Sequence, residues 1–514
     1  MKIDHAQGKY YLHKDQPTPP SYWLASTPQT NYPALEEDIT VDVAVIGGGM
    51  AGISTAYLLA KEGLKVVILE EGRILEGTTA HTTAKLTSQH GLIYAKLQQQ
   101  RGPETAKLYA EANQTAIEFV AKLVEEEKID CDFSRQPAYI YTQDESYLVK
   151  IQEELNAAKE SGIDAHYASK LDLPFEVKGA LRFDEQAQFH PRKYLLALAQ
   201  KFEKLGGRIF EHSKAVDVRE EGPYLVYTAQ GKKVKADYVI LASHYPFHIL
   251  PGLYPLRIYQ EREYALVIKA KEQFPGGMYI NAEDPPRSLR GLPTPEGERI
   301  LIVGEKHRTG HGVNLTEHYQ NLMKFALENF TVEEFSYHWS TQDCVTLDDI
   351  PYIGQSSQDR PNLYVATGFR KWGMTHSTVA ALLIRDQIIK GHSPWQEVYA
   401  PSREITLDTA LTFVSNTSQI VFDMLAGKLM RGDKEYNLKP GEGVIANIDG
   451  KRAGVYMDQE HKLHKVDTTC THMGCELEWN DAELSWDCPC HGSRFDVDGN
   501  PIAGPALKPL KSLE

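Results

Sequence analysis

The sequence predicts a large α/β domain near the front of the chain and a small domain rich in cysteine and histidine at the back. Two observations lead to this fold class. The segment "VDVAVIGGGMAGISTAYLLA" (41–60) has the pattern of a buried strand, a glycine turn and a helix. The segments "CTHMGC" (470–475) and "CPCHGS" (488–493) contain four of the six cysteines. At 514 residues, the chain is long enough for roughly three domains.

Composition narrows the class of protein. The chain is 42% apolar and 24% charged, which is typical of a soluble globular protein. A net charge of −15 without a compact Lys/Arg cluster argues against a nucleic-acid partner. The N-terminus has no basic segment followed by an apolar one, and the apolar stretch 41–60 contains Asp42 and three consecutive glycines. We therefore expect no export signal and no transmembrane segment, and predict a cytoplasmic protein.

The glycine turn has the spacing Gly47, Gly49 and Gly52. The first glycine permits a tight turn, the second lets a pyrophosphate approach the backbone, and the third lets the helix pack on the strand. A second strand, 65–70, ends in Glu70, where an acid can accept hydrogen bonds from a ribose. Strand, turn, helix, second strand and terminal acid in this order predict a Rossmann-like dinucleotide site. The alternative is a glycine turn that binds no nucleotide.

Two distant segments indicate which dinucleotide is bound. Residues 42–87 resemble the N-terminal FAD segment of the D-amino-acid-oxidase-like family, which includes glycine oxidase, sarcosine oxidase and dimethylglycine dehydrogenase. Residues 348–384 resemble that family's C-terminal FAD motif, in which a Pro-x-Ile-Gly strand precedes a glycine-rich turn and a helix beneath the flavin. The resemblance implies FAD as a cofactor. The FAD-binding residues that it implies are Gly47, Gly49, Gly52, Glu70, Gly368, Gly373 and Met374.

The resemblance also implies how the chain is divided. After an N-terminal extension, 1–37, an FAD-dependent oxidoreductase module occupies 38–400. Within it, an α/β FAD-binding domain is interleaved with an α+β substrate domain. The FAD-binding segments are about 38–95, 180–250 and 340–400, and the substrate-domain segments are about 96–179 and 251–339.

Local patterns agree with parts of this division. The segment 235–245 fits a strand that returns to the FAD sheet, and an amphipathic helix is predicted over 191–207. The glycines of 301–312 do not have dinucleotide spacing, so we expect no separate NAD(P)H domain. A linker, 401–431, leads to the C-terminal domain, 432–514. We expect the partly amphipathic segment 407–432 to dock on the flavin domain rather than on a membrane.

The resemblance places two candidate catalytic residues near the flavin. Lys371 lies where glycine-oxidase-like members carry an arginine that binds a substrate carboxylate, although a lysine lacks the bidentate fork. His81 lies four residues after Gly77, where histidyl-flavin members place the residue that is covalently joined to the flavin. The alternatives are a solvated lysine and a polar residue beside the isoalloxazine. Three further residues fall in segments expected around the substrate, where aromatic side chains more often serve packing: Trp339, Tyr264 and Arg257.

The cysteines and histidines near the C-terminus form two pairs. Cys470 and His472 have the spacing C-x-H, and Cys488 and His491 have the spacing C-x-x-H. Two loops could therefore converge on one metal centre, and ligand softness alone leaves iron and zinc open. The residues around both pairs resemble the Rieske iron–sulfur proteins of respiratory and photosynthetic complexes, and the likeness continues through 493–510.

This second resemblance implies a small all-β Rieske domain with one [2Fe-2S] cluster. Cys470 and Cys488 are then ligands of one iron, His472 and His491 are ligands of the other, and Cys475 and Cys490 form a disulfide. The alternatives are a zinc ribbon and, for the disulfide, two free cysteines.

Residues around the cluster bear on its reduction potential. Because two neutral imidazoles replace thiolates, Rieske centres accept electrons at about −150 to +300 mV, compared with about −400 mV for plant-type ferredoxins. Ser493 matches a serine that hydrogen-bonds a bridging sulfide in the respiratory proteins. Phe495 replaces the tyrosine of the highest-potential members, so we expect a lower potential here.

Together these features predict an FAD-dependent oxidoreductase, a dehydrogenase rather than an oxidase. It oxidises a small amine or amino-acid-like substrate and relays electrons through the cluster to an external acceptor, either a protein or a quinone. One alternative is an oxidase that uses oxygen directly and has a structural cluster. Another is a non-catalytic redox sensor whose cluster controls the binding of a partner protein.

Overall fold

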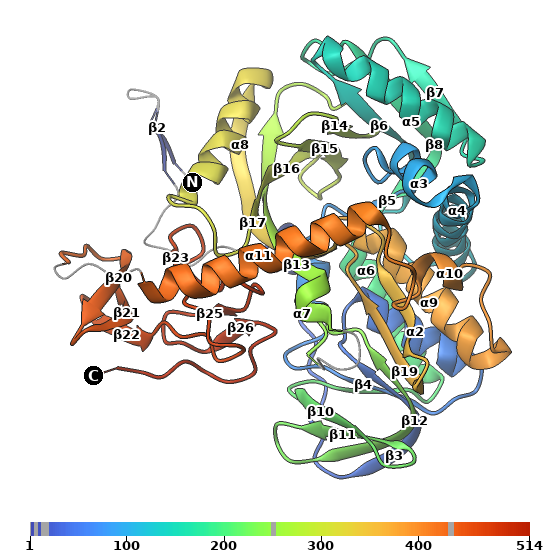
Figure 1. Ribbon diagram of the computed structural model, residues 1–514. Helices are drawn as coiled ribbons and strands as arrows, with labels where there is room; N and C mark the ends of the chain where they lie inside the picture. Colours follow the sequence, from blue (N-terminus) through green and yellow to red (C-terminus); the bar gives the residue numbers. More distant parts are fainter. Residues whose placement is uncertain (1, 5–8, 12–19, 248–252, 430–435, 514) are drawn as a thin grey trace.

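The computed structural model describes residues 2–4, 9–11, 20–247, 253–429 and 436–513 (Figure 1). Two large sheets and their helices form the first four-fifths of the chain, and a smaller β domain follows at the C-terminus. Within the described residues, no helix is both long and apolar enough to cross a membrane.

The first sheet has eight strands and contains the predicted strand–turn–helix unit. Strand β3 (Ile39–Ile46) lies between β4 (Val66–Leu69) and β12 (Lys233–Leu241), and all three are parallel. The last four residues of β3 and all of β4 are buried, as expected for continuous apolar runs in a parallel sheet. The remaining strands are β9 (Arg208–Phe210), β10 (Ala215–Glu220), β11 (Tyr224–Thr228), β18 (Tyr352–Ser357) and β19 (Arg360–Thr367).

Three helices pack together beside this sheet and share one hydrophobic core. They are α2 (Met50–Lys61), α6 (Pro191–Lys204) and α9 (Gly373–Lys390). Helix α6 is the helix expected over 191–207. It ends earlier because Leu205 is its C-cap and Gly206 takes a positive φ.

The second sheet has nine strands in the order β17-β13-β16-β15-β14-β6-β8-β5, and β7 pairs with β8. The strands are β5 (Lys85–Leu86), β6 (Ser134–Thr142), β7 (Ala165–Ala168), β8 (Gly179–Gln188), β13 (Ile258–Ala270), β14 (Met278–Asn281), β15 (Arg287–Leu292), β16 (Arg299–Arg308) and β17 (Val332–Thr346). Strand β8 and the end of β17 fall inside segments expected for the FAD-binding domain, but their hydrogen-bonded partners lie in the second sheet. Helices α5 (Leu148–Glu160) and α8 (Thr316–Asn329) pack on strands of this sheet. Helices α3 (Ile93–Arg101) and α4 (Pro103–Glu126) pack against each other and against α5, and α4 also packs against α9.

The C-terminal domain consists of two small antiparallel sheets. One contains β20 (Gly443–Ile448), β21 (Lys451–Met457) and β22 (Leu463–Asp467), and the other contains β23 (Glu478–Asn480), β24 (Ser485–Asp487), β25 (Arg494–Phe495) and β26 (Pro501–Ala503). Helix α11 (Leu407–Leu429) runs from the first part of the chain to this domain (Figure 1). The connector thus forms a helix that lies against both parts.

Several short elements complete the description. They are β1 (Lys2–Asp4), β2 (Lys9–Tyr11), α1 (Tyr22–Ala25), α7 (Tyr254–Arg257), α10 (Gln396–Tyr399) and the 3-10 turns Thr78–His81 and Glu145–Tyr147.

Candidate functional site

The glycine turn after β3 forms one wall of a cavity. Gly47 has φ +108°, and a Cβ there would lie 2.4 Å from the carbonyl oxygen of Ala242. A Cβ on Gly52 would lie 1.9 Å from the oxygen of Gly47, so α2 packs directly on the turn. Gly49 has ordinary backbone angles, and its added Cβ would contact only Thr79 Oγ1, at 3.3 Å. The fold therefore requires glycine at 47 and 52, whereas Gly49 exposes bare backbone to the cavity.

Glu70 follows β4 and holds two loops together at this wall. Its Oε2 accepts a hydrogen bond from Gly48 N at 2.7 Å, and its Oε1 accepts one from Gly72 N at 2.9 Å. Burial raises the pKa of Glu70, and the two backbone donors oppose this effect. Both loops line the cavity together with the carboxylate.

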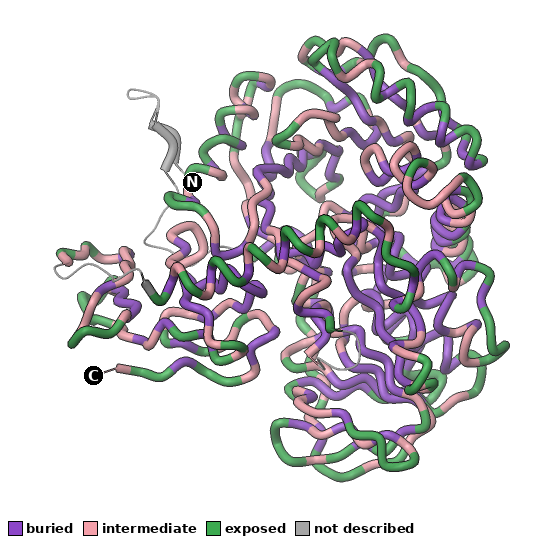
Figure 2. The backbone as a smooth tube through the Cα atoms, in the orientation of Figure 1, coloured by how far each residue is buried: buried purple, intermediate pink, exposed green. Residues whose placement is uncertain are grey.

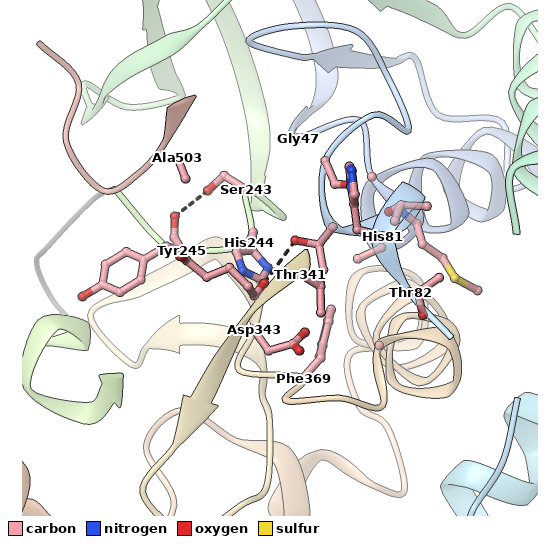
Figure 3. A pocket seen from close by; sticks show the side chains of 18 of the residues that line it. Gly47, His81, Thr82, Ser243, His244, Tyr245, Thr341, Asp343, Phe369 and Ala503 are labelled. Atoms are coloured by element: carbon pink, nitrogen blue, oxygen red, sulfur yellow. Dashed lines mark hydrogen bonds between the residues drawn. The ribbon is translucent and has the colours of Figure 1, made fainter. Parts of the chain in front are cut away.

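The cavity has a volume of about 480 Å³ and lies between the two sheets and the C-terminal domain. In Figure 3, His81 and Thr82 lie on one side of it, Asp343 and Phe369 on another, and Ala503 of the C-terminal domain lies near Ser243. The residues that the C-terminal domain contributes to its wall are Glu483, Arg494, Ile502, Ala503, Gly504, Pro505 and Leu507. A molecule that fills the cavity would therefore meet residues from both parts of the chain.

The two cysteine- and histidine-containing loops converge in the C-terminal domain. The Cys470 and Cys488 thiols are buried and hydrogen-bond each other, which lowers the pKa of Cys470 and raises that of Cys488. The rings of His472 and His491 have centroids 5.0 Å apart. Both ring nitrogens of His491 and Nδ1 of His472 are buried without a hydrogen-bond partner among the described residues. Such orphaned imidazole nitrogens next to paired thiols fit a mixed Cys/His cluster site.

A disulfide joins Cys475 and Cys490, with Cα atoms 6.5 Å apart. Its two sulfurs and the sulfur of Cys488 all lie within 4.8 Å of one another. Within each loop, backbone hydrogen bonds close the turn: Gly474 N donates to Cys470 O, and Gly492 N donates to Cys488 O, both at 2.9 Å. The disulfide therefore ties together the two loops that carry the proposed ligands.

Comparison with known proteins identifies both parts of the chain. The family described as FAD dependent oxidoreductase (DAO) matches residues 42–387, which is more than half of the chain. The chain belongs to this family of FAD-dependent oxidoreductases. The Rieske [2Fe-2S] domain family matches residues 430–514. FAD and a [2Fe-2S] cluster are thus the cofactors of this oxidoreductase, as the sequence predicted.

Relatives of the oxidoreductase include proteins similar to all of it or to one part. YhfW of Bacillus subtilis (strain 168), whose name describes it as a Rieske 2Fe-2S iron-sulfur protein, is 43% identical over 98% of this chain and 99% of its own length. Gamma-glutamylputrescine oxidoreductase of Escherichia coli (strain K12) is 28% identical over 44% of this chain and 54% of that protein. Glycine oxidase from Geobacillus kaustophilus has a similar fold, with a TM-score of 0.60 and 19% identity, over 71% of this chain and 99% of that structure.

Lys371 of the oxidoreductase lines the cavity but is already paired. Its Nζ forms an ion pair with Glu263 Oε1, and both side chains are largely buried. This pair could not be predicted from the sequence, because Glu263 lies on β13, more than a hundred residues away. The charge of the lysine is therefore balanced before any substrate binds.

His81 lies at the end of the turn Thr78–His81 and also lines the cavity. Its Nδ1 lies 2.8 Å from the carbonyl oxygen of Gly77, which can only accept a hydrogen bond, so Nδ1 carries the proton. Burial lowers the pKa of His81, which favours the neutral ring. The Nε2 atom is then the nitrogen with a free lone pair.

The three residues expected from the C-terminal FAD motif have different positions. Gly373 and Met374 begin α9 and line the cavity. Gly368 does not line it: this residue has φ +76°, and a Cβ there would lie 2.3 Å from Thr346 Cγ2. Gly368 thus shapes the turn after β19 rather than the cavity surface.

The three other residues expected around the substrate lie outside the cavity wall, and two unexpected titratable residues lie in it. Trp339, Tyr264 and Arg257 do not line the cavity: Trp339 Nε1 donates to His81 O at 3.0 Å, and Arg257 donates to Pro401 O at 2.7 Å. Sequence reasoning missed Lys85, the first residue of β5, which lines the cavity four residues after His81. Burial lowers the pKa of Lys85 to about 7, and Arg290 adds to this effect. It also missed Asp343, whose pKa burial and Glu263 raise well above its usual value.

The loop 488–493 is packed against strands of the second sheet. Gln342 Nε2, on β17, donates to Gly492 O at 2.9 Å. A Cβ on Gly492 would lie 2.4 Å from Gln260 Cγ, on β13. A Cβ on Gly310, after β16, would lie 2.4 Å from Pro489 N. In this packing His491 is 1% exposed, whereas His472 is partly exposed.

Proposed function

We propose that this oxidoreductase oxidises a small amine or amino-acid-like substrate and relays the electrons through the Rieske domain to an external acceptor. The observation that carries the proposal is the shared cavity wall. Gln342 on β17 lines the cavity and also donates to Gly492 O in the loop 488–493, and Gly310, just after β16, packs against Pro489 of the same loop. When bound, FAD takes two electrons from a C–H bond beside an amine, and the cluster takes one electron at a time.

The unequal exposure of the two histidines supports a direction for the relay. His491 is buried against the flavin module, and His472 is partly open to solvent. We infer that His491 is on the side where electrons enter and His472 on the side where an acceptor approaches. Cys470 and Cys488 are the proposed ligands of the other iron, and the Cys475–Cys490 disulfide supports both loops.

The charges in the cavity favour an amine as the substrate group that is recognised. The positive charge of Lys371 is balanced by Glu263, so Lys371 does not offer an unpaired charge to a substrate carboxylate. Lys85 has a pKa of about 7, so its Nζ can accept or release a proton at neutral pH. An amine must lose its proton before oxidation, and Lys85 Nζ is the proposed site that takes it. The name of the E. coli relative also specifies an amine-derived substrate for that protein.

The remaining site residues have proposed supporting roles. Gly49 and Glu70 receive the pyrophosphate and ribose of FAD at the start of α2, where the helix N-terminus favours an anion. Gly373 and Met374, at the start of α9, would hold the flavin. His81 Nε2 is the atom proposed for covalent attachment to the flavin.

Anaerobic stopped-flow mixing of the purified protein with a panel of amines tests the proposal. The flavin absorbance should bleach first and the cluster absorbance should fall afterwards. His491→Cys should impair only the second phase, whereas His461→Cys, the same change at an exposed position between β21 and β22, should leave both phases intact.

Two outcomes would contradict the relay. A cluster that stays oxidised while the flavin is fully reduced, together with one hydrogen peroxide per substrate in air, would indicate an oxidase with a structural cluster. Absence of flavin bleaching across the whole amine panel would instead indicate a redox sensor.

A further inference from the structure

Helix α11 is held by one face and exposes the other. Asn416 Nδ2 donates to Leu256 O at 3.2 Å, and Asp423 lies 3.3 Å from His311. Ile420 is 4% exposed and packs with the core of the Rieske domain. These three contacts reach both parts of the chain, so the orientation of the helix about its axis is fixed.

The opposite face carries a continuous apolar stripe, and Figure 2 shows exposed residues along the helix. Six large apolar side chains are at least half exposed: Leu407, Leu411, Val414, Val421, Phe422 and Leu425. Five of these residues, together with Ser418, occupy positions 407, 411, 414, 418, 421 and 425. Successive positions in this set are four and three residues apart in turn, as in the seam of a coiled coil. Phe422 lies next to this set. A surface helix of a monomer normally places polar residues on this face.

The charges around the stripe favour another protein helix over a bilayer. Between Asp408 and Lys428, the only charged residue is Asp423, which is buried. Helices that lie on membranes usually carry several Lys or Arg residues on their polar face. A chain with net charge −15 would also be repelled by anionic lipids.

We propose that α11 pairs in antiparallel orientation with α11 of a second copy of this chain. The stripe is complementary to itself in that orientation, as a two-fold interface requires. Leu407 then faces Leu425 of the second copy, Leu411 faces Val421, and Val414 faces Ser418 at the centre. Each pair combines the two seam positions of the repeat, which is the arrangement of antiparallel coiled coils.

The ends of the stripe are complementary in charge. Helix α11 carries exposed Asp408 in its first turn and exposed Lys428 in its last turn, and an antiparallel pair brings the first turn of one copy to the last turn of the other. A parallel pair would instead place Lys428 beside Lys428. One helix pair is small compared with the roughly 800 Å² per partner of a standard interface, so the dimer should depend on concentration. The second helix would lie across the junction of the flavin module and the Rieske domain.

Sedimentation velocity of the full-length holoprotein over a concentration series tests the pairing. Wild type should move from monomer to dimer as its concentration rises. Val414→Asp buries an unpaired charge in the seam and should raise the dimer dissociation constant at least about tenfold. Thr412→Asp, which adds the same charge to an exposed position off the stripe, should leave the constant unchanged. Unchanged flavin and cluster absorbance in both variants shows that the fold is intact.

A charge exchange tests the orientation separately. Asp408→Lys should weaken the dimer, and the double variant Asp408→Lys/Lys428→Asp should restore it. Wild type that stays monomeric throughout the series, or a dimer that Val414→Asp leaves unchanged, would overturn the proposal. Binding of monomeric wild type to phosphatidylethanolamine/phosphatidylglycerol vesicles, abolished by Val414→Asp, would also overturn it in favour of a lipid surface.

Discussion

Single residues of the glycine turn have separable roles. A side chain at Gly47 or Gly52 would overlap the backbone, whereas at Gly49 it would contact only Thr79 Oγ1 at 3.3 Å. Gly49→Val should therefore fold and keep the cluster, but lose most of its FAD because the pyrophosphate cannot approach the backbone. The ratio of flavin to iron in the purified variant measures this loss.

A second glycine nearby provides the control for Gly49. Gly72→Val places the same side chain in a loop with ordinary backbone angles, where the nearest atom, Glu70 Oε1, is 4.0 Å away. That variant should retain wild-type flavin content. A full complement of FAD in Gly49→Val would show that the pyrophosphate does not lie at this glycine.

Lys85 makes the stability of the protein depend on pH. Its buried Nζ donates to Tyr279 O at 2.7 Å and to Ser288 Oγ at 2.6 Å, and burial lowers its pKa to about 7, compared with about 10.4 in an unfolded chain. Between these values the unfolded chain binds the proton and the folded chain does not. The free energy of unfolding therefore rises with pH, by up to about 1.4 kcal/mol per pH unit.

Replacing this lysine should remove that rise. We expect the Tm of wild type to increase relative to that of Lys85→Met between about pH 7 and pH 10. Lys65→Met, at an exposed position, should follow wild type. A difference in Tm between wild type and Lys85→Met that does not change with pH would show that Lys85 keeps an ordinary pKa in the folded protein.

Among the elements, the loop after β16 holds the cluster loop against the flavin module. Gly310 has φ +75°, and its Cβ would lie 2.4 Å from Pro489 N. Gly310→Val should displace the loop 488–493 at a cost of about 1–3 kcal/mol. We expect normal flavin bleaching by substrate but slower reduction of the cluster, measured by stopped-flow absorbance.

Gly310→Val also strains the backbone, because φ is positive there, so a control is needed that strains the backbone without displacing the cluster loop. Gly297 also has a positive φ, of +108°, in the turn between β15 and β16, but a Cβ there would have no neighbour within 4 Å. In the Gly297→Val variant, the cluster should therefore be reduced after substrate addition at the wild-type rate. Equal slowing in both variants would mean that backbone strain on either side of β16, and not contact with Pro489, slows the reduction of the cluster.

At the scale of the whole molecule, α11 connects the two cofactor-binding parts. It contacts the flavin module at Leu256 and the Rieske core through Ile420. The connector thus contacts the flavin module, as expected, and it also packs on the Rieske domain. A second copy bound to the exposed stripe would lie over the same junction.

The sequence by itself determined the features that depend on local spacing. The glycine turn needs fixed intervals between Gly47, Gly49 and Gly52, and the cluster loops need C-x-H and C-x-x-H pairs, so both cofactors could be predicted from short segments. The strand, turn and helix at 39–61 followed for the same reason, because their apolar and glycine pattern is local.

Only the tertiary structure decided which distant residues meet. Lys371 pairs with Glu263 across two sheets, Gln342 donates to the backbone of the cluster loop, and Glu483 enters the cavity from the other domain. No pattern in the chain encodes these contacts, because they depend on how the sheets and domains pack. The same reason explains the stripe on α11: its apolar spacing is visible in the sequence, but which face is buried depends on the domains around it.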